Sequence, residues 1–376
     1  MAEIHGTCDE RFVAVRDALS NSLEKGADVG ASVAVTVDGE LVVDVWGGHL
    51  GDADATPWER DTITNVWSTT KTMTALCALM LADAGQIDLH GPVARYWPEF
   101  AANGKADVEV RHLLGHTSGL SGWQEPMTFE DLYDWDRATS ALAAQAPWWE
   151  PGTASGYHAI TQGFLVGEVI RRVTGQTVGQ FFRTEVAVPL GLDFHIGLAP
   201  SEFGRVANVI PPPPLPVEGL DPVSIMVRTF ANPLVVADVA WTDDWRTAEI
   251  PAANGHGNAR SVALGQAIVA CGGELRGRRF LSTAGCRAIF EEQANGVDLV
   301  LGAPLRFGIG YGLPSPDAPM SPNEHASYWG GWGGSVIVVD QDARMTVAYM
   351  MNRMEAGVVG DERGMGVVNA AYGALA

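Results

Sequence analysis

The sequence predicts an α+β fold in which strands near both ends of the chain form one antiparallel sheet and a mostly helical region is inserted between them. Three observations support this fold class. β-Branched runs separated by short turns occur near both ends, helical patterns lie beside them, and the middle of the chain alternates helical patterns with loops rich in Gly, Pro and Trp. Because strands from the two ends must pair, the predicted sheet domain is discontinuous.

The N-terminal segment is predicted to form a helix followed by a hairpin. Residues 10–23 place apolar side chains at helical spacing. The runs 31–37 and 41–46 are β-branched and are joined through the turn Asp38-Gly39-Glu40. A largely apolar helix then follows over residues 72–84 and ends at Gly85, because glycine adopts the left-handed conformation without a Cβ penalty.

The remaining elements follow the same reasoning. The inserted region has helical patterns at 108–115, 129–146, 159–174 and 261–271. Residues 211–216 are nearly all proline, which excludes helix and central strand and predicts an extended loop. A second hairpin (335–340 and 345–351) and a helix (364–375) close the chain. We therefore expect a sheet domain of residues 1–90 and 285–376 and a helical domain of residues 91–284, with the functional site in the cleft between them.

Composition excludes several classes of protein. The chain has 376 residues, of which 47% are hydrophobic and 18% charged, so it can bury a large core. A net charge of -21 would repel phosphate backbones, which argues against nucleic-acid binding. No apolar run is long enough to span a bilayer, and the first six residues lack the features of a signal peptide, so we expect a cytoplasmic protein without membrane attachment. The four cysteines lack C-x-x-C spacing and are expected to be reduced thiols.

The segment Ser68-Thr69-Thr70-Lys71 places one of only three lysines three positions after a serine. The other two, Lys25 and Lys105, are flanked by small and acidic residues and are predicted to lie on the surface. Residues three apart share one face of a helix, so the Lys71 amine is expected beside the Ser68 hydroxyl at the start of the apolar helix.

The chemistry of this pair is specific. A serine hydroxyl needs a base to become a nucleophile, and burial lowers the pKa of a lysine so that the neutral amine can serve as that base. Free N–H groups of the first helical turn can stabilise a nearby developing anion. On the four-residue pattern alone, a surface role for Lys71 stays open, because so short a motif recurs by chance.

Two further clusters could join this pair. Tyr157 follows a Pro-Gly turn and precedes a helix, so its phenol could enter a cleft and, if cations lower its pKa, transfer protons; an ordinary half-buried tyrosine is the alternative. The segment 328–335 has four glycines and leads into a strand, which suits close approach of a ligand. A backbone N–H from this segment, together with that of Ser68, would form an oxyanion hole; a glycine-rich turn packed on the sheet is the alternative.

A metal site is not expected. His112 and His116 are four apart on a predicted helix, but Leu113 stands where the H-E-x-x-H motif requires glutamate, and zinc needs further ligands. No metal or organic cofactor is therefore predicted. A helix that ends at Gly115 in a turn is the better interpretation.

Taken together, the motifs resemble the serine β-lactamase and penicillin-binding-protein-like superfamily over most of the chain, and within it the family VIII carboxylesterases, which are similar to class C β-lactamases. The resemblance implies the β-lactamase-like form of the α+β fold. It rests on motifs in the order of the superfamily: Ser68-Thr69-Thr70-Lys71, Arg111-His112-Leu113-Leu114-Gly115-His116-Thr117-Ser118-Gly119-Leu120, Glu150-Pro151-Gly152 leading into Tyr157, and Trp329-Gly330-Gly331.

The resemblance implies a role for each matching residue. Ser68 would be the nucleophile, Lys71 its activating base, and Tyr157 the tyrosine of the Y-x-N motif. Trp329-Gly330-Gly331 stands in place of K-T-G, and the oxyanion donors would be the backbone amides of Ser68 and Trp332. The substrate would lie along Trp329, Gly330 and Gly331, within an aromatic wall to which Trp123 and Trp148 are candidate contributors.

Two departures from the superfamily pattern bear on the substrate. Ala159 occupies the position of the Y-x-N asparagine, so the amide that would hold Lys71 and a substrate amide is absent. Trp329 replaces the lysine of K-T-G and removes a positive charge suited to the carboxylate of β-lactams. Both changes favour neutral esters, so the expected function is a serine carboxylesterase that hydrolyses small or short-chain esters through an acyl-enzyme on Ser68.

Three alternatives stay open at this point. An amide-directed hydrolase (β-lactamase, D-aminopeptidase or amide-oligomer hydrolase) or an acyltransferase would use the same Ser68 and Lys71. A non-catalytic binding protein on the same fold would form no acyl-enzyme. An α/β-hydrolase is excluded because the sequence has no G-x-S-x-G nucleophile elbow. The expected partner is a small-molecule ester, and self-association into a homo-oligomer is left open.

Overall fold

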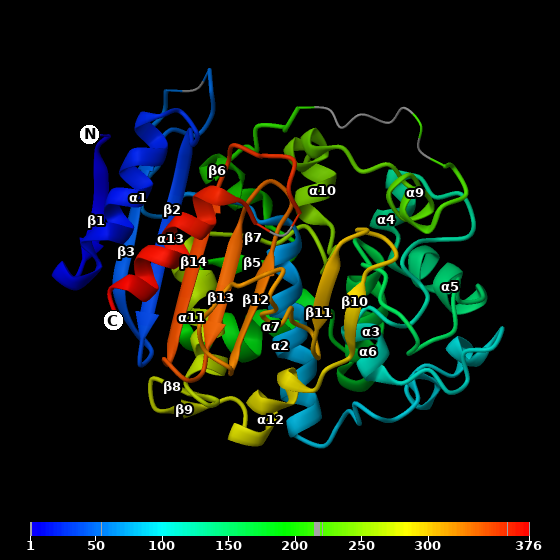
Figure 1. Ribbon diagram of the computed structural model, residues 1–376. Helices are drawn as coiled ribbons and strands as arrows, with labels where there is room; N and C mark the ends of the chain where they lie inside the picture. Colours follow the sequence, from blue (N-terminus) through cyan, green and yellow to red (C-terminus); the bar gives the residue numbers. More distant parts are fainter. Residues whose placement is uncertain (1, 54, 214–218, 220, 359, 376) are drawn as a thin grey trace.

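The computed structural model describes residues 2–53, 55–213, 219, 221–358 and 360–375, and it confirms the α+β prediction. A six-stranded antiparallel sheet has the strand order β1-β3-β2-β14-β13-β12 (Figure 1). The two expected hairpins join through the β2–β14 pair, where Val33 lies opposite Tyr349. The strands are β1 (Ile4–Cys8), β2 (Gly30–Val37), β3 (Glu40–Gly48), β12 (Ala326–Gly330), β13 (Val336–Asp340) and β14 (Met345–Met351).

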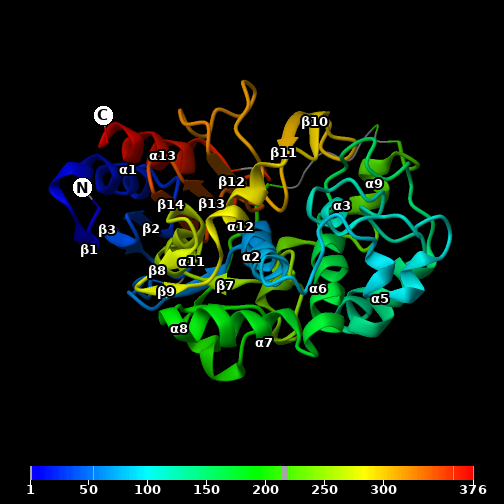
Figure 2. The same ribbon diagram turned by 90° about the horizontal axis from the view of Figure 1, so that it is seen from below.

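Helices cover both faces of the sheet (Figures 1 and 2). On one face α1 (Val13–Glu24), preceded by a 3-10 turn at Glu10–Phe12, packs beside α13 (Glu362–Gly373). On the other face α11 (Ala259–Ala270) packs against β2, β13 and β14. Strands β13 and β14 are buried along their whole length, which is why their sequences are continuous apolar runs rather than alternating ones.

The helical region lies beside the sheet rather than on it. Its main helix is α6 (Thr161–Thr174), which ends at Gly175 in the left-handed conformation. The prediction of one helix over 129–146 is wrong, because Asp134 ends α4 and its side chain accepts a 3.0 Å hydrogen bond from the Arg137 amide to begin α5. The other helices here are α3 (Val110–Leu114), α4 (Phe129–Tyr133), α5 (Trp135–Ala144), α7 (Val178–Phe182), α8 (Val188–Leu190), α9 (Ile225–Phe230) and α10 (Asp243–Thr247).

Helix α2 (Thr70–Asp83) lies between these two parts and contacts α6 and α7 as well as α11. Gly85 after it has φ 70°, as predicted for its C-terminal end. Short elements complete the fold: the small sheet of β4 (Ile63–Asn65), β5 (Phe194–His195), β6 (Val206–Ala207) and β7 (His256–Gly257), the pairs β8 (Glu274–Leu275) with β9 (Arg278–Arg279) and β10 (Ala294–Val297) with β11 (Pro304–Phe307), and α12 (Thr283–Arg287).

The division into domains at residues 90/91 and 284/285 stays a prediction. Helix α11 falls within the range 91–284 by sequence but packs on the sheet in space. Residues 211–213 have no regular secondary structure, and the rest of the proline-rich loop lies outside the described residues. Within the described ranges, no helix has both the length and the apolar character needed to cross a membrane.

Candidate active site

Ser68 is presented by a strained turn at the start of α2. β4 leads into a 3-10 turn at Trp67–Thr69, in which Trp67 has φ 49°, a left-handed value that costs a non-glycine residue about 1–3 kcal/mol. The indole of Trp67 is held between Trp245 and Trp332, at ring-centroid distances of 5.7 Å and 5.0 Å. Thr70 Oγ1 donates a 2.5 Å hydrogen bond to the Trp67 carbonyl. Packing of the ring on both sides therefore maintains the turn that places the Ser68 hydroxyl beside Lys71 and Tyr157.

Lys71 lies beside Ser68, and its environment favours the neutral amine. Its Nζ is 3.2 Å from Ser68 Oγ and donates to the carbonyl oxygens of Ala159, at 2.7 Å, and Ala252, at 2.9 Å. Complete burial holds the pKa of Lys71 well below its ordinary value. A neutral amine has two N–H groups and one lone pair. The two carbonyls occupy both N–H groups, so the lone pair faces the Ser68 hydroxyl and can take its proton.

The same geometry shows what replaces the missing asparagine at position 159. The main-chain carbonyl of Ala159, rather than a side-chain amide, accepts the hydrogen bond from Lys71. Ala252, far along the chain, supplies the second carbonyl. Sequence reasoning missed both groups, because every residue carries a carbonyl and only the fold decides where it points.

Tyr157 is the second side chain hydrogen-bonded to Ser68, and unlike Lys71 it acts as a donor to the hydroxyl oxygen. Its phenol donates a 2.5 Å hydrogen bond to Ser68 Oγ, and Lys71 Nζ is 4.9 Å from the centre of its ring. Burial raises the pKa of Tyr157 above its ordinary value, and the Ser68 hydrogen bond only partly opposes this. The condition considered from the sequence, a Tyr157 pKa lowered by cations, is therefore not met. Tyr157 is a neutral phenol that can donate or pass on a proton, and not a phenolate base.

The glycine-rich segment after β12 is pressed against the Ser68 turn. Ser335 Oγ donates to the Val66 carbonyl at 2.9 Å and lies 3.0 Å from Thr69 Oγ1. A β-carbon added to Gly331 would collide with Ser335 Oγ and the Val66 carbonyl and lie 3.3 Å from the Ser68 nitrogen. Glycine is thus required at 331 by close approach. Sequence reasoning missed Ser335, although its place directly after the glycines was a usable signal.

The amides of Ser68 and Trp332 are available to a ligand. No hydrogen bond joins either amide to another residue in the described part of the chain. The neighbouring amides are used: Gly331 N–H donates to the Ser335 carbonyl at 2.8 Å, and Gly333 N–H to the Gly357 carbonyl at 2.9 Å. Unused backbone donors beside a nucleophile are what an oxyanion hole requires.

A small apolar cavity of about 20 Å³ adjoins Tyr157. Trp329 contributes to its wall and is itself stacked on His116 at a centroid distance of 5.3 Å. The residues lining the cavity are Tyr157, Leu301, Leu305, Phe307, Gly312, Tyr328, Trp329, Gly330 and Val358. Of the residues predicted to bind substrate, Trp329 and Gly330 line this cavity, and Gly331 lies at the Ser68 turn.

The other two tryptophans predicted to form the wall lie elsewhere. Trp123 is buried in the helical region, packs against Phe164 and donates to the Ala138 carbonyl at 3.0 Å. Trp148 lies under the guanidinium of Arg228, 3.9 Å from its ring centre. Neither lines the cavity beside Tyr157, because the loops that carry them fold onto the helical region.

Of the three other polar residues that the sequence singled out, Lys105 alone departs from its prediction. Lys105 is fully buried, so the surface prediction for it is wrong: its Nζ donates to the carbonyls of Ala102 and Gln145. His112 lies in α3, whereas His116 lies beyond that helix with φ 60°. Among the described residues, no group of three or more His, Cys, Asp or Glu side chains is placed to hold a metal ion.

The chain is similar to known proteins over nearly its whole length. A family model described as Beta-lactamase matches residues 15–371. The Esterase/beta-lactamase LipL of Mycobacterium tuberculosis is 36% identical over 371 residues, which cover 95% of this chain and 84% of that protein. A family VIII carboxylesterase crystal structure is 42% identical with a TM-score of 0.93, covering 98% of this chain and 99% of that one. A penicillin-binding protein homologue from Caulobacter crescentus is 38% identical with a TM-score of 0.94, covering 99% and 100%. This chain, with its serine and lysine at the head of α2, is therefore a member of the beta-lactamase family.

Proposed function

We propose that the protein is a serine carboxylesterase that hydrolyses small or short-chain esters through an acyl-enzyme on Ser68. The observation that carries the proposal is the hydrogen-bonded series Tyr157–Ser68–Lys71, in which Lys71 has both N–H groups occupied and its lone pair free for the Ser68 proton. The names of the relatives support it, since one is an esterase/beta-lactamase and another a family VIII carboxylesterase.

In the first step, Lys71 takes the proton of Ser68 as Ser68 Oγ attacks the ester carbonyl. The negative charge that develops on the carbonyl oxygen is stabilised by the amides of Ser68 and Trp332, donors of a kind worth roughly 3 kcal/mol each in the transition state. The leaving alkoxide then needs a proton. The proton that Lys71 took from Ser68 returns to the alkoxide, either from Lys71 directly or by way of Tyr157, and both groups are hydrogen-bonded to Ser68 Oγ.

The second step reverses these roles with water in place of the alcohol. Water attacks the acyl carbonyl while neutral Lys71, directly or through Tyr157, accepts its proton. Collapse of the intermediate returns a proton to Ser68 Oγ and releases the acid, so the enzyme ends in its starting state. Every proton transfer uses groups that lie within one hydrogen bond of Ser68.

Esters are favoured over β-lactams by the residues that surround the series. Trp329 offers an apolar ring where a carboxylate-bearing substrate would need a cation. Ala159 presents no side-chain amide to a substrate, and its carbonyl is already occupied by Lys71. A neutral ester needs neither a cation nor an amide partner beyond the two backbone donors.

The proposal is tested by intact-protein mass after brief exposure to a p-nitrophenyl alkylphosphonate, followed by peptide mapping. We expect one stoichiometric adduct on Ser68 and loss of p-nitrophenyl butyrate hydrolysis in proportion to labelling. A chromogenic cephalosporin, assayed in parallel, should be turned over far more slowly than the ester. Absence of any adduct would refute the catalytic assignment, and faster cephalosporin turnover would refute the ester preference.

The pH dependence of kcat/KM should follow the protonation of the Lys71 amine. The protonated amine is inactive, so activity falls as pH drops through the pKa of Lys71 and is retained above it. Because burial lowers that pKa well below its ordinary 10.5, activity should already be high near neutrality. Burial raises the pKa of Tyr157, so no loss is expected near pH 10, where an ordinary tyrosine ionises. A rate profile measured with an uncharged ester contradicts this assignment if activity appears only near the ordinary lysine pKa.

The cavity beside Tyr157 should limit the acyl chain. Its volume of about 20 Å³ holds little more than one water, so an acyl chain can extend there only by displacing the apolar walls, and the displacement needed grows with chain length; butyrate esters should therefore be preferred to octanoate esters. Leu305→Ala removes one wall and should improve octanoate relative to butyrate by about tenfold in kcat/KM. Leu299→Ala, on an exposed neighbouring residue, is the matched control and should leave the ratio unchanged. An unchanged ratio in Leu305→Ala would place the acyl group elsewhere.

A further inference from the structure

The backbone around Tyr157 has no regular secondary structure, although its phenol must meet Ser68 Oγ at 2.5 Å. Residues 154–158 form neither helix nor strand nor turn, so no run of helical or sheet hydrogen bonds fixes them. The amides of Gly156, Tyr157 and His158 bond instead to groups from distant parts of the chain. The position of the Tyr157 phenol therefore depends on a few long-range contacts.

His116 holds this stretch on one side. Its carbonyl accepts a 3.0 Å hydrogen bond from the Gly156 amide, and its Nδ1 accepts one of 3.0 Å from the His158 amide. The His116 ring also packs against the ring of Tyr157, at a centroid distance of 5.3 Å. The two amides that flank the amide of Tyr157 thus bond to a single residue, and the amide between them bonds elsewhere.

Asp298 holds the amide of Tyr157 itself. Its Oδ1 accepts the hydrogen bond at 3.0 Å, from a residue 141 positions away in the chain. The next residue, Leu299, donates its amide to the Ser155 carbonyl at 2.9 Å, so two contacts join the two segments. The Asp298 side chain is almost fully buried. Removal of its carboxylate would therefore leave the Tyr157 amide without a partner in a buried place, which is costly.

The same oxygen of Asp298 organises the turn that carries one wall of the cavity beside Tyr157. Oδ1 also accepts hydrogen bonds from the amides of Val300 and Leu301, each at 2.9 Å. This turn joins β10 to β11, and both Leu301 and Leu305 line the cavity. One carboxylate oxygen thus connects the backbone of Tyr157 to the cavity wall.

We propose that Asp298 is a positioning residue that sets both the place of Tyr157 against Ser68 and the length of acyl chain that the cavity accepts. This role rests on the esterase function proposed above. A long acyl chain that displaces Leu301 would move Asp298 and, through it, Tyr157. Because a misplacement of about 1 Å can cost about a hundredfold in rate, the penalty for long chains should fall on kcat as well as on KM.

The acceptor and the charge of Asp298 can be separated. Its Oδ2 is buried and has no hydrogen-bond partner among the described residues, so asparagine can place its amide nitrogen there and keep its oxygen on the same amides. Burial is the main cause of the raised pKa of Tyr157, and the charge of Asp298 is a lesser one. The phenol should stay neutral without that charge, and Asp298→Asn should keep kcat within about threefold of native.

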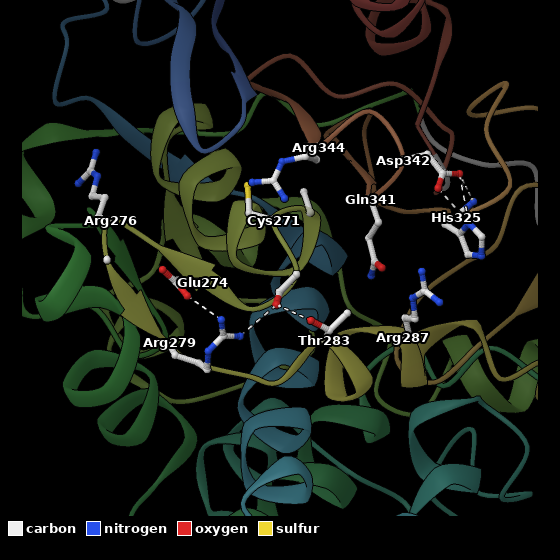
Figure 3. A pocket seen from close by; sticks show the side chains of 13 residues that line it. Cys271, Glu274, Arg276, Arg279, Thr283, Arg287, His325, Gln341, Asp342 and Arg344 are labelled. Atoms are coloured by element: carbon white, nitrogen blue, oxygen red, sulfur yellow. Dashed lines mark hydrogen bonds and ion pairs between the residues drawn. The ribbon is translucent and has the colours of Figure 1, made fainter.

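The test compares Asp298→Ala, Asp298→Asn and a control with the native enzyme on p-nitrophenyl butyrate and octanoate, with kcat counted per phosphonate-labelled site. The control is Asp342→Ala. Asp342 is also a turn aspartate that accepts the amide of a distant residue, His325, at 2.9 Å, but it lines a separate cavity that shares no residue with the one beside Tyr157 (Figure 3). We expect Asp298→Ala to lose about thirtyfold in kcat on butyrate and to narrow the butyrate-to-octanoate ratio of kcat about tenfold. Asp298→Asn and Asp342→Ala should keep the native ratio.

Hydrogen exchange of the peptide that contains Tyr157 gives a readout independent of turnover. Exchange there should accelerate in Asp298→Ala while β13 and β14 stay protected, whereas a general loss of stability would also expose those strands. Native exchange and a native chain-length ratio in Asp298→Ala would overturn this role and leave the esterase proposal intact. Absence of ester hydrolysis and of Ser68 labelling in the native protein would overturn the esterase proposal, and exchange would still show whether Asp298 holds Tyr157.

A further variant covers the case in which Asp298→Ala does not fold. Serine supports a turn of this kind through its hydroxyl, but its side chain is one bond shorter than that of aspartate and should not reach the Tyr157 amide. Asp298→Ser should therefore fold, lose kcat and expose the peptide around Tyr157 to exchange. Native kcat and native exchange in Asp298→Ser would overturn the proposal, as would a loss of more than about tenfold in kcat for Asp298→Asn.

Discussion

Lys71→Met should lower ester hydrolysis by roughly a thousandfold or more, to the residual level of Ser68→Ala, because the amine is the only base hydrogen-bonded to Ser68 in the proposed mechanism. Methionine has similar length and is apolar, so the buried site stays filled. Since nucleophile and base act as a unit, the double variant should be no slower than either single variant. Steady-state kcat and KM for p-nitrophenyl butyrate provide the measurement.

The chain offers matched controls in its two other lysines. Lys105 is also buried, donates to two carbonyls, and has a pKa lowered to about 8 by burial, but has no serine beside it. Lys105→Met should therefore cost stability while leaving kcat nearly unchanged, and Lys25→Met, on an exposed residue, should change neither. If Lys71→Met kept more than a tenth of native kcat, Lys71 would not be the base.

Gly331→Ala should lower kcat by at least about a hundredfold with a smaller effect on KM. The added methyl group would collide with Ser335 Oγ and the Val66 carbonyl, so the segment carrying the Trp332 amide must move away from the Ser68 turn. Loss of one oxyanion donor costs about 10²–10³ in kcat in enzymes of this type of chemistry. The measurement is kcat together with the rate of phosphonate labelling, both of which depend on the oxyanion hole.

A second glycine-to-alanine change controls for the substitution itself. Gly366 is an exposed residue of α13, and a β-carbon there would meet nothing within 4 Å. Gly366→Ala should leave activity unchanged and raise stability by up to about 1 kcal/mol, since alanine is the better helix former. Full activity in Gly331→Ala would show that the Trp332 amide is not needed for catalysis.

The sequence predicted those parts of the fold and site that depend on local spacing or on strong patterns. The helix that begins at Thr70 places Ser68 and Lys71 side by side because residues three apart share a face. β-Branched runs predicted the β2–β3 and β13–β14 hairpins and their union in one antiparallel sheet, whereas the strands that join them, β2 and β14, were not predicted. Strand β1 was not predicted, because Ile4–Cys8 is exposed over most of its length and lacks an apolar pattern.

What the sequence could not predict was set by tertiary packing. The carbonyls of Ala159 and Ala252 hold Lys71, but no residue type encodes where a carbonyl points. Lys105 has a surface-like context of small and acidic neighbours, yet the loop closes over it. Trp123 was a candidate for the substrate wall because aromatic content alone does not tell a core position from a cleft position.

The contact between Thr69 and Ser335 joins residues 266 positions apart. During synthesis on the ribosome, the segment with the nucleophile and its base emerges long before the segment with the Trp332 amide. A chain interrupted before residue 331 would therefore carry Ser68 and Lys71 without the partner that completes their site. Under the proposed mechanism, hydrolytic activity would therefore appear only after the segment 331–335 has been synthesised and has packed against the Ser68 turn.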